Sequence, residues 1–240
     1  TITLGDGNNT VLGGMGADAI TTGNGADTIL GDNGFVQMDV TGQVFQRIAS
    51  TVVDQGGDDT ISAGNGDKSV LGGYGNDTIT VGTGIHTVLG DNGNIDFSSA
   101  GVRAMVTSSA HLIGGDDRII AAGGDSIVIA GLGDDNVATG GGNDVLIGDN
   151  GFVMLDGQGR VARAETSWPA IGGRDALSAD GGNDVLLGGF GADTLLGGDG
   201  NDMLLGDGGR VTYAAGVISV VESIDPFIGS PDYLDGGAGQ

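Results

Sequence analysis

The chain has 240 residues, of which 53 are glycine, about three times the share found in average globular proteins. Aromatic residues make up only 4% of the chain, so the sequence predicts a thin hydrophobic core. The 32 acidic and 8 basic residues give a net charge of −24, which excludes nucleic acid and anionic membrane surfaces as partners and favours cations. There is no cysteine for disulfides, and no apolar run is long enough to span a membrane.

The acidic residues are almost all aspartate, since only Glu165 and Glu222 are glutamates. A short carboxylate suits tight turns and metal-binding loops, whereas a merely solvated acidic surface uses glutamate at least as often. The bias therefore predicts a chemical role for the aspartates.

A nine-residue period first appears at Gly13–Thr21 and returns clearly at Gly72–Thr80, Gly188–Leu196 and Gly197–Leu205. We count sixteen copies, and the eighth position of every copy is aliphatic: Val11, Ile20, Ile29, Ile61, Val70, Ile79, Val88, Ile119, Val128, Val137, Leu146, Leu177, Leu186, Leu195, Leu204 and Leu234. The pattern predicts a six-residue turn followed by three extended residues whose middle side chain points inward. Two such units form one coil with a strand on each side.

A longer period is marked by similar segments that begin at Gly31, Gly90, Gly148 and Gly206, spaced 59, 58 and 58 residues apart. Each marker opens an insertion with two apolar runs around a turn, which predicts a β-hairpin, with a disordered loop as the alternative. We therefore expect one continuous array with repeat blocks at 1–34, 54–93, 112–151, 170–209 and 227–240, and hairpins at 35–53, 94–111, 152–169 and 210–226.

The sixth position of the repeat is Asp in twelve of the sixteen copies: Asp18, Asp27, Asp59, Asp77, Asp117, Asp135, Asp144, Asp175, Asp184, Asp193, Asp202 and Asp232. Calcium binds six to eight oxygens, and glycine-rich turns supply carbonyls while the Asp supplies charge. Twelve in register favour multiple Ca2+ ions over the alternative that Gly and Asp serve only as turn formers. Because stacked carboxylates repel, we predict that the chain folds only when it binds calcium.

The exceptions to this rule are Asn9, Lys68, His86 and Ser126, which all fall in the second or fourth repeat of a block. Odd and even turns lie on opposite flanks of a block, so one flank is predicted to be a full carboxylate ladder and the other to lack ions around these residues. Whether this parity continues across the insertions is open. Lys68 either replaces an ion or reflects decay of the repeat.

The insertion markers carry a further aspartate, at Asp32, Asp91, Asp149 and Asp207. These four side chains are candidate calcium ligands or caps of the turn, and the sequence does not separate the two roles.

The Gly-Gly-x-Gly-x-Asp nonapeptide resembles that of the repeats-in-toxin (RTX) family of calcium-binding proteins. The resemblance implies an all-β, right-handed parallel β-roll, type I secretion from bacteria, folding on extracellular calcium, and a ligand role for the twelve sixth-position aspartates. The hairpin every 58 residues departs from an uninterrupted toxin block and resembles the arrays of large bacterial surface and matrix proteins.

We therefore expect a calcium-stabilised segment of a secreted bacterial fibre, adhesin or biofilm-matrix protein, which associates with itself end to end or laterally through the hairpins. The alternative is a secretion and folding module attached to a hydrolase, protease or toxin. The register at which the chain begins and stops suggests a piece of a longer array. An enzyme is not expected, since the only histidines are His86, in a repeat, and His111, in an insertion.

Overall fold

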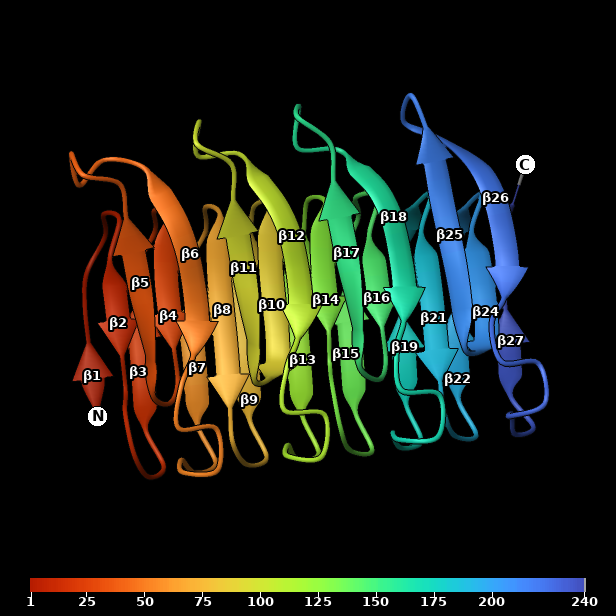
Figure 1. The fold of residues 1–240 in the computed structure, drawn as a ribbon, viewed down its shortest axis with the longest axis horizontal. Coiled ribbons are helices and arrows are strands. Elements are labelled where there is room, and N and C mark those ends of the chain that lie inside the picture. The colour runs from red at the N-terminus through yellow and green to blue at the C-terminus, as the bar shows by residue number, and fades with distance from the viewer. Residues whose placement is uncertain (240) are drawn as a thin grey trace.

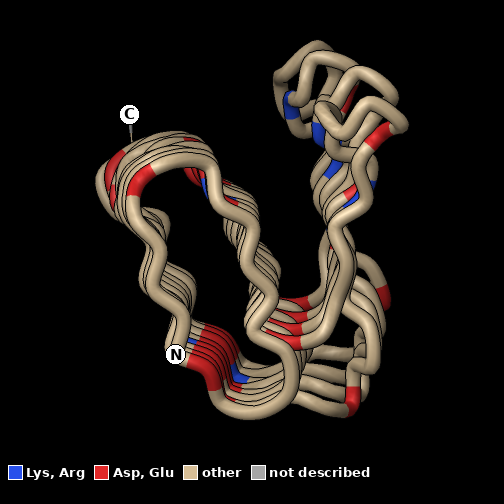
Figure 2. Tube along the Cα trace, turned by 90° about the vertical axis from the view of Figure 1, so that its left-hand side faces the viewer, with Lys and Arg blue, Asp and Glu red and all other residues tan. Residues whose placement is uncertain are grey.

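The computed structural model describes residues 1–239, which form 27 β-strands and no helix. The strands build three long sheets that run side by side along the molecule (Figure 1). Viewed along this axis, two parallel sheets, here called A and B, close into a flattened roll, and an antiparallel sheet, here called C, stands beside sheet B (Figure 2). The predicted parallel β-roll with hairpin insertions is confirmed.

The bounds of the strands follow the repeat. Sheet A contains β1 (Ile2–Thr3), β3 (Ala19–Thr22), β7 (Thr60–Ala63), β9 (Thr78–Thr83), β13 (Arg118–Gly123), β15 (Asn136–Thr139), β19 (Ala176–Ser178), β22 (Thr194–Leu196) and β27 (Tyr233–Asp235). Sheet B contains β2 (Thr10–Leu12), β4 (Asp27–Leu30), β8 (Lys68–Gly73), β10 (His86–Asp91), β14 (Ser126–Ile129), β16 (Val145–Ile147), β21 (Val185–Gly189) and β24 (Met203–Asp207). The short strands β20 (Gly181–Gly182) and β23 (Asp199–Gly200) pair with each other.

The core of the roll consists of the eighth-position side chains, which stack in register from coil to coil. Ile61, for example, lies between Ile20 and Ile79 in sheet A. Fourteen of the sixteen predicted side chains are buried in one cluster; Leu204 packs against it half-buried, and Leu234, in β27, is exposed. A continuous stack of aliphatic side chains therefore holds sheets A and B together.

Sheet C is a single antiparallel sheet of eight strands built entirely from the insertions. It contains β5 (Gly34–Met38), β6 (Phe45–Ser50), β11 (Gly93–Phe97), β12 (Arg103–Ser108), β17 (Gly151–Leu155), β18 (Val161–Thr166), β25 (Gly209–Ala214) and β26 (Val217–Ser223). Each hairpin pairs with the next through β6–β11, β12–β17 and β18–β25. The disordered-loop alternative is therefore wrong.

A second hydrophobic core lies between sheet C and the outer face of sheet B. Ile48, Ile95 and Val153 of the hairpins pack there against residues such as Leu71 and Ile147 of the roll. The expectation of a thin core is therefore wrong, because the apolar runs of the insertions cover the roll. Sheet B becomes the central layer and is buried on both faces, as in β4 and β14.

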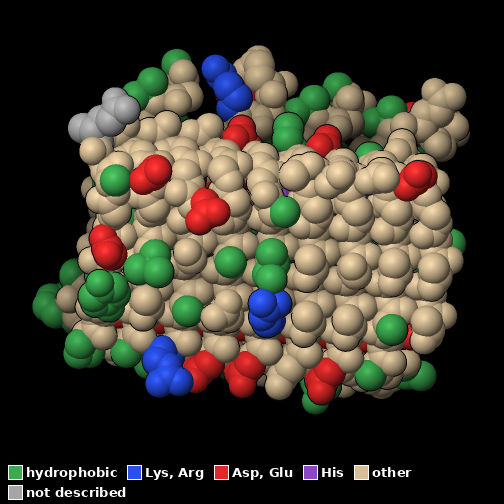
Figure 3. All heavy atoms as spheres, turned by 180° about the vertical axis from the view of Figure 1, so that it is seen from behind, with side chains coloured by type: hydrophobic (Ala, Val, Ile, Leu, Met, Phe, Trp, Pro, Cys, Tyr) green, Lys and Arg blue, Asp and Glu red, His purple; other side chains and the backbone are tan. Residues whose placement is uncertain are grey.

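The outer face of sheet A has no covering layer, and its strands alternate buried and exposed residues. Figure 3 shows this face, where hydrophobic side chains are few and acidic ones lie mainly toward the two rims. The rims correspond to the turns, where the chemistry of the repeat is concentrated.

Each hairpin ends in a tight turn built around a non-glycine residue with positive φ. These residues are Val52, Ala110, Trp168 and Asp225, and the carbonyl of each accepts a hydrogen bond from the N–H three residues later. The Trp168 ring is stacked on that of His111 at the end of the preceding hairpin, with centroids 3.6 Å apart. Both residues therefore pack together at the base of sheet C.

Candidate metal centre

The aspartates of the odd turns form one continuous stack at the turn that enters sheet A. The strands that follow Asp18, Asp59, Asp77, Asp117, Asp135, Asp175, Asp193 and Asp232 are consecutive neighbours in sheet A. Each hairpin interrupts an odd turn internally, so that Gly31 and Asp32 precede it and Gly57 to Asp59 complete the turn. The odd–even parity therefore continues across the insertions. Figure 2 shows the resulting column of acidic residues beneath sheets A and B.

From Asp59 onward, one oxygen of each odd-flank carboxylate accepts a backbone N–H of the preceding coil and so joins the two coils. The backbone N–H of Asp77 donates to Oδ1 of Asp117 (2.7 Å), and the N–H of Asp117 donates to Oδ1 of Asp135 (2.7 Å). The other oxygen, Oδ2, is buried without a hydrogen-bond partner at Asp59, Asp77, Asp117, Asp135, Asp175 and Asp193. A buried carboxylate oxygen without a donor is costly, so each of these oxygens requires a cation or a proton.

The space in front of each unpartnered oxygen is lined by further acceptors. A Cβ placed on Gly90 would lie 2.1 Å from Asp117 Oδ2 and 2.6 Å from the carbonyl oxygen of Ala130, and Gly31 stands in the same relation to Asp59 and Gly72. Carboxylate and carbonyl oxygens thus converge there without a donor between them. Within residues 1–239, no three acidic or imidazole side chains gather into one site, so carbonyls must supply part of any shell. This donor set fits calcium.

Burial and like charges strongly oppose ionisation of the ladder. Burial, reinforced by Asp91 and Asp135, raises the pKa of Asp117 to about 10. Burial raises the pKa of Asp77 to about 9, and burial together with neighbouring carboxylates raises that of Asp175 to about 10. Without a bound cation these groups would hold protons at neutral pH, so the fold as built demands positive charge along this flank.

The even flank repeats this arrangement only in part. The N–H of Ser126 donates to Oδ1 of Asp144 and that of Asp144 to Oδ1 of Asp184 (2.7 Å each). Oδ2 is again buried and unpartnered at Asp144, Asp184 and Asp202. Between Asp27 and Ser126 the stack passes through Lys68 and His86, where the repeat carries no carboxylate.

His86 is fully buried, and its Nε2 donates to the carbonyl oxygen of Gly82 (2.8 Å). Burial lowers the pKa of His86, so the imidazole is neutral. In the neighbouring hairpin, Arg103 donates to Oγ1 of Thr87. This stretch of the even flank therefore holds a neutral imidazole, whose Nδ1 is buried without a partner, in place of a carboxylate.

The insertion aspartates close the interrupted turns. Oδ1 of Asp91 accepts the N–H of Gly115 (3.0 Å), beyond the hairpin, and Oδ2 accepts the N–H of Leu132 (2.6 Å) in the next coil. Asp149 makes the same two contacts with Gly173 and Phe190, and Asp32 and Asp207 each make one of them. Because both carboxylate oxygens of Asp91 and of Asp149 accept N–H groups, this geometry favours a role in capping the turn over a role as a calcium ligand for these two residues.

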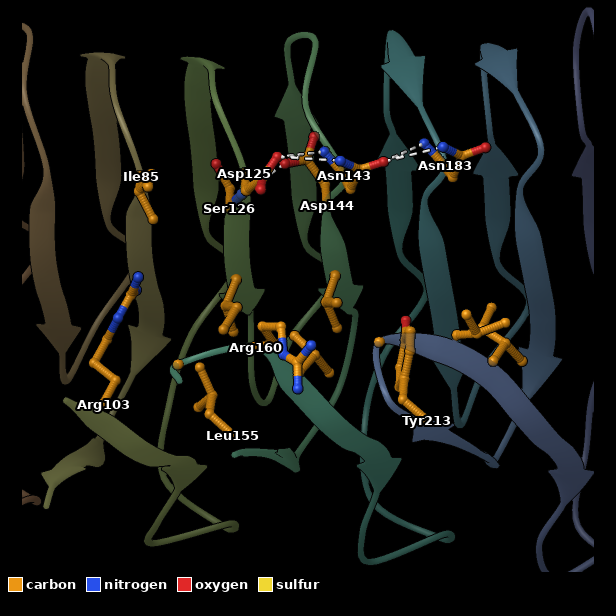
Figure 4. Close-up of a pocket in the computed structure, with 17 residues that line it drawn as sticks. Ile85, Arg103, Asp125, Ser126, Asn143, Asp144, Leu155, Arg160, Asn183 and Tyr213 are labelled. Atoms are coloured by element: carbon orange, nitrogen blue, oxygen red, sulfur yellow. Dashed lines mark hydrogen bonds between the residues drawn. The ribbon is translucent and has the colours of Figure 1, made fainter. Parts of the chain in front are cut away.

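A second polar ladder, which we did not predict, occupies the fifth position of the turns. Its Asx side chains each accept the N–H of the fifth residue in the next coil, as Asp125 does from Asn143 (2.8 Å) and Asn143 from Asn183 (3.1 Å) (Figure 4). The sequence signal for this ladder was the frequent occurrence of Asn and Asp at the fifth position. These exposed side chains fix the stacking of turns rather than hold an ion.

A groove of about 720 Å³ separates the even turns from the hairpins (Figure 4). Arg103, Leu155 and Tyr213 line it from sheet C, Arg160 lines it from the tip of the third hairpin, and Asp144 lines it from the turns. The Asp144 side chain itself stays buried behind this groove.

Comparison with known families agrees with this chemistry. Residues 1–35, 53–85, 113–146 and 172–212 match the RTX calcium-binding nonapeptide repeat, in four copies that span more than half of the chain. The chain belongs to the RTX family. RTX repeats imply calcium binding and a protein of the secreted type. The matched segments leave most of sheet C outside them.

No curated protein matches the chain. Residues 1–239 contain no helix with the length and apolar character needed to cross a membrane.

Proposed function

We propose that this RTX segment is a calcium-stabilised structural element of a secreted bacterial fibre, adhesin or surface matrix, and that it has no catalytic role. The observation that carries the proposal is the run of buried, unpartnered Oδ2 atoms along the ladder. Each of these buried carboxylates must gain either a proton or a cation when the chain folds, so at neutral pH the stability of the fold is tied to the concentration of a cation.

The ligands proposed for Ca2+ are the twelve sixth-position aspartates together with turn carbonyls. The odd flank offers Asp18, Asp59, Asp77, Asp117, Asp135, Asp175, Asp193 and Asp232, and the even flank offers Asp27, Asp144, Asp184 and Asp202. Asp32, Asp91, Asp149 and Asp207 support the odd flank by closing its interrupted turns. When bound, calcium neutralises the ladder and joins consecutive coils.

Self-association is proposed through the hairpin sheet and the ends of the roll. Strand β26 is exposed along its whole length and carries the apolar residues Val217, Ile218, Val220 and Val221. A hairpin added beside it would continue the pairing that joins β18 to β25. The same type of contact that builds sheet C within the chain can therefore extend it into a fibre.

Light scattering and electron microscopy of the purified chain, with calcium and with EGTA, test this proposal. Calcium-dependent filaments or sheets are expected. Calcium-folded particles that stay monomeric at all concentrations would refute the fibre role and favour a folding module attached to another secreted domain.

A further inference from the structure

Lys68 is the only lysine of the chain, and its whole side chain is buried inside the even flank. Its ammonium group lies between two consecutive turns of that flank, at residues 22–27 and 63–68. Nζ donates to the carbonyl oxygens of Gly25 (2.5 Å) and Asn65 (2.9 Å) and lies 3.2 Å from Oδ2 of Asp27. An ammonium has three N–H donors, and here each faces an oxygen.

The two turns are joined differently from those of the carboxylate ladder. In the ladder, the N–H of a sixth residue donates to a carboxylate of the next coil, as from Asp144 to Asp184. The N–H of Asp27 donates instead to the carbonyl oxygen of Asp67 (3.1 Å). The turns of Asp27 and Lys68 are therefore joined by a backbone–backbone hydrogen bond in place of the N–H to carboxylate bond of the ladder.

Asp27 is also the ladder-position carboxylate with partners on both oxygens. Oδ1 accepts the backbone N–H and the side-chain amide of Asn9 (2.9 Å each), and Oδ2 accepts the hydroxyl of Thr22 (2.9 Å) and faces Lys68. Elsewhere on this flank the corresponding Oδ2 atoms of Asp144 and Asp184 have no partner. The demand for a cation is thus met at Asp27 and unmet at Asp144 and Asp184.

We propose that the Lys68 ammonium takes the place of a calcium ion between the turns at residues 22–27 and 63–68, so that this step of the even flank is closed without metal. A decayed repeat would leave a buried lysine with unpaired donors, whereas every donor here has an oxygen from one of the two coils it joins. The inference rests on the proposed calcium ladder, since it concerns the step at which that ladder omits an ion.

Counting bound calcium by equilibrium dialysis and elemental analysis tests the inference. The variant Lys68→Asp restores a sixth-position carboxylate and is expected to bind one more ion per chain than the wild type. Arg160→Asp changes the charge by the same amount at an exposed hairpin tip and is expected to leave the count unchanged. An equal count for Lys68→Asp and wild type would overturn the inference, while a wild type that binds no calcium would overturn the ladder itself.

A measurement on the wild type decides the matter if Lys68→Asp does not fold. Lysine labelled with ¹⁵N gives one side-chain signal in this chain, because Lys68 is its only lysine. We expect a protected ammonium signal from the folded chain at saturating calcium. An unprotected ammonium in the chain that calcium has fully folded would mean that an ion displaces it, and the inference would be wrong.

Discussion

Replacing Asp117 by Asn is expected to change stability in opposite directions with and without calcium. The Asn side chain keeps an oxygen for the N–H of Asp77 but removes the buried charge at Oδ2. The variant therefore separates a role in turn formation from a role in binding a cation.

The loss in calcium follows from mass action. An ion present at a hundred times its dissociation constant stabilises the folded chain by about 2.7 kcal/mol, so Asp117→Asn costs about 3 kcal/mol for each ion that it loses. The gain without metal follows from the pKa of Asp117, which burial and the carboxylates of Asp91 and Asp135 raise from 3.8 to about 10. At pH 7, folding without metal requires Asp117 to take up a proton. This protonation costs about 1.4 kcal/mol for each pH unit above the unfolded pKa of 3.8, or about 4 kcal/mol in total.

Circular dichroism measures both effects. In excess calcium, the urea midpoint of Asp117→Asn is expected to fall. In EGTA, folding driven by an osmolyte is expected to need less osmolyte than for wild type. Asp116→Asn is the matched control, since this adjacent side chain is exposed and the same charge is removed. Equal destabilisation of Asp117→Asn in both conditions would show that the carboxylate only shapes the turn.

Three further predictions concern the oxygen-lined space beside Gly90, the second core and pH. Gly90→Ala puts a methyl group 2.1 Å from Asp117 Oδ2, so calcium uptake is expected to fall and stability in calcium to drop by about 3 kcal/mol. The control Gly157→Ala has open space around it and is expected to change uptake and stability little. Equal effects of the two variants in dialysis and urea titrations would show that the space beside Gly90 holds no ion. Ile95→Ala empties part of the second core and is expected to lower the free energy of unfolding in urea by about 2–5 kcal/mol. Val40→Ala, at an exposed position, is expected to cause no measurable loss. A loss under about 1 kcal/mol for Ile95→Ala would mean that sheet C contributes little to stability. The ladder pKa values are raised from 3.8 to between about 6 and about 10, so protonated carboxylates stabilise the metal-free fold below about pH 4, and this stability is lost as the pH rises. The β signal in EGTA is therefore expected at about pH 4 and is expected to disappear as the pH rises to neutrality. A signal that rises with pH would contradict these shifts.

Much of the roll could be predicted from the sequence, because the repeat determines the register. Once each copy places an aliphatic residue at its eighth position, stacking the copies aligns residues such as Ile61 and Ile79 without further information. The parity of Lys68 and His86 follows in the same way, since alternate turns must lie on opposite flanks.

The third layer was harder to predict, because pairing between hairpins joins residues of separate modules. A signal was present: even strands are apolar on both sides of the eighth position, as in Ile127 and Ile129, whereas odd strands carry polar residues, as in Thr78 and Thr80. Strands that are apolar on both faces must pack against another layer on each face, and the hairpins were the only segments outside the roll that could form the second layer. The capping contacts of Asp91 join three segments of the chain, and spacing alone could not identify them.

The central claim is that the carboxylate ladder binds calcium and that folding depends on it. Measuring circular dichroism together with the number of bound ions per chain, at neutral pH during a titration from EGTA to excess calcium, tests it most directly. The ladder predicts an unfolded chain in EGTA that gains its β signal as several ions bind. An unchanged β signal throughout the titration, with no calcium bound, would contradict it.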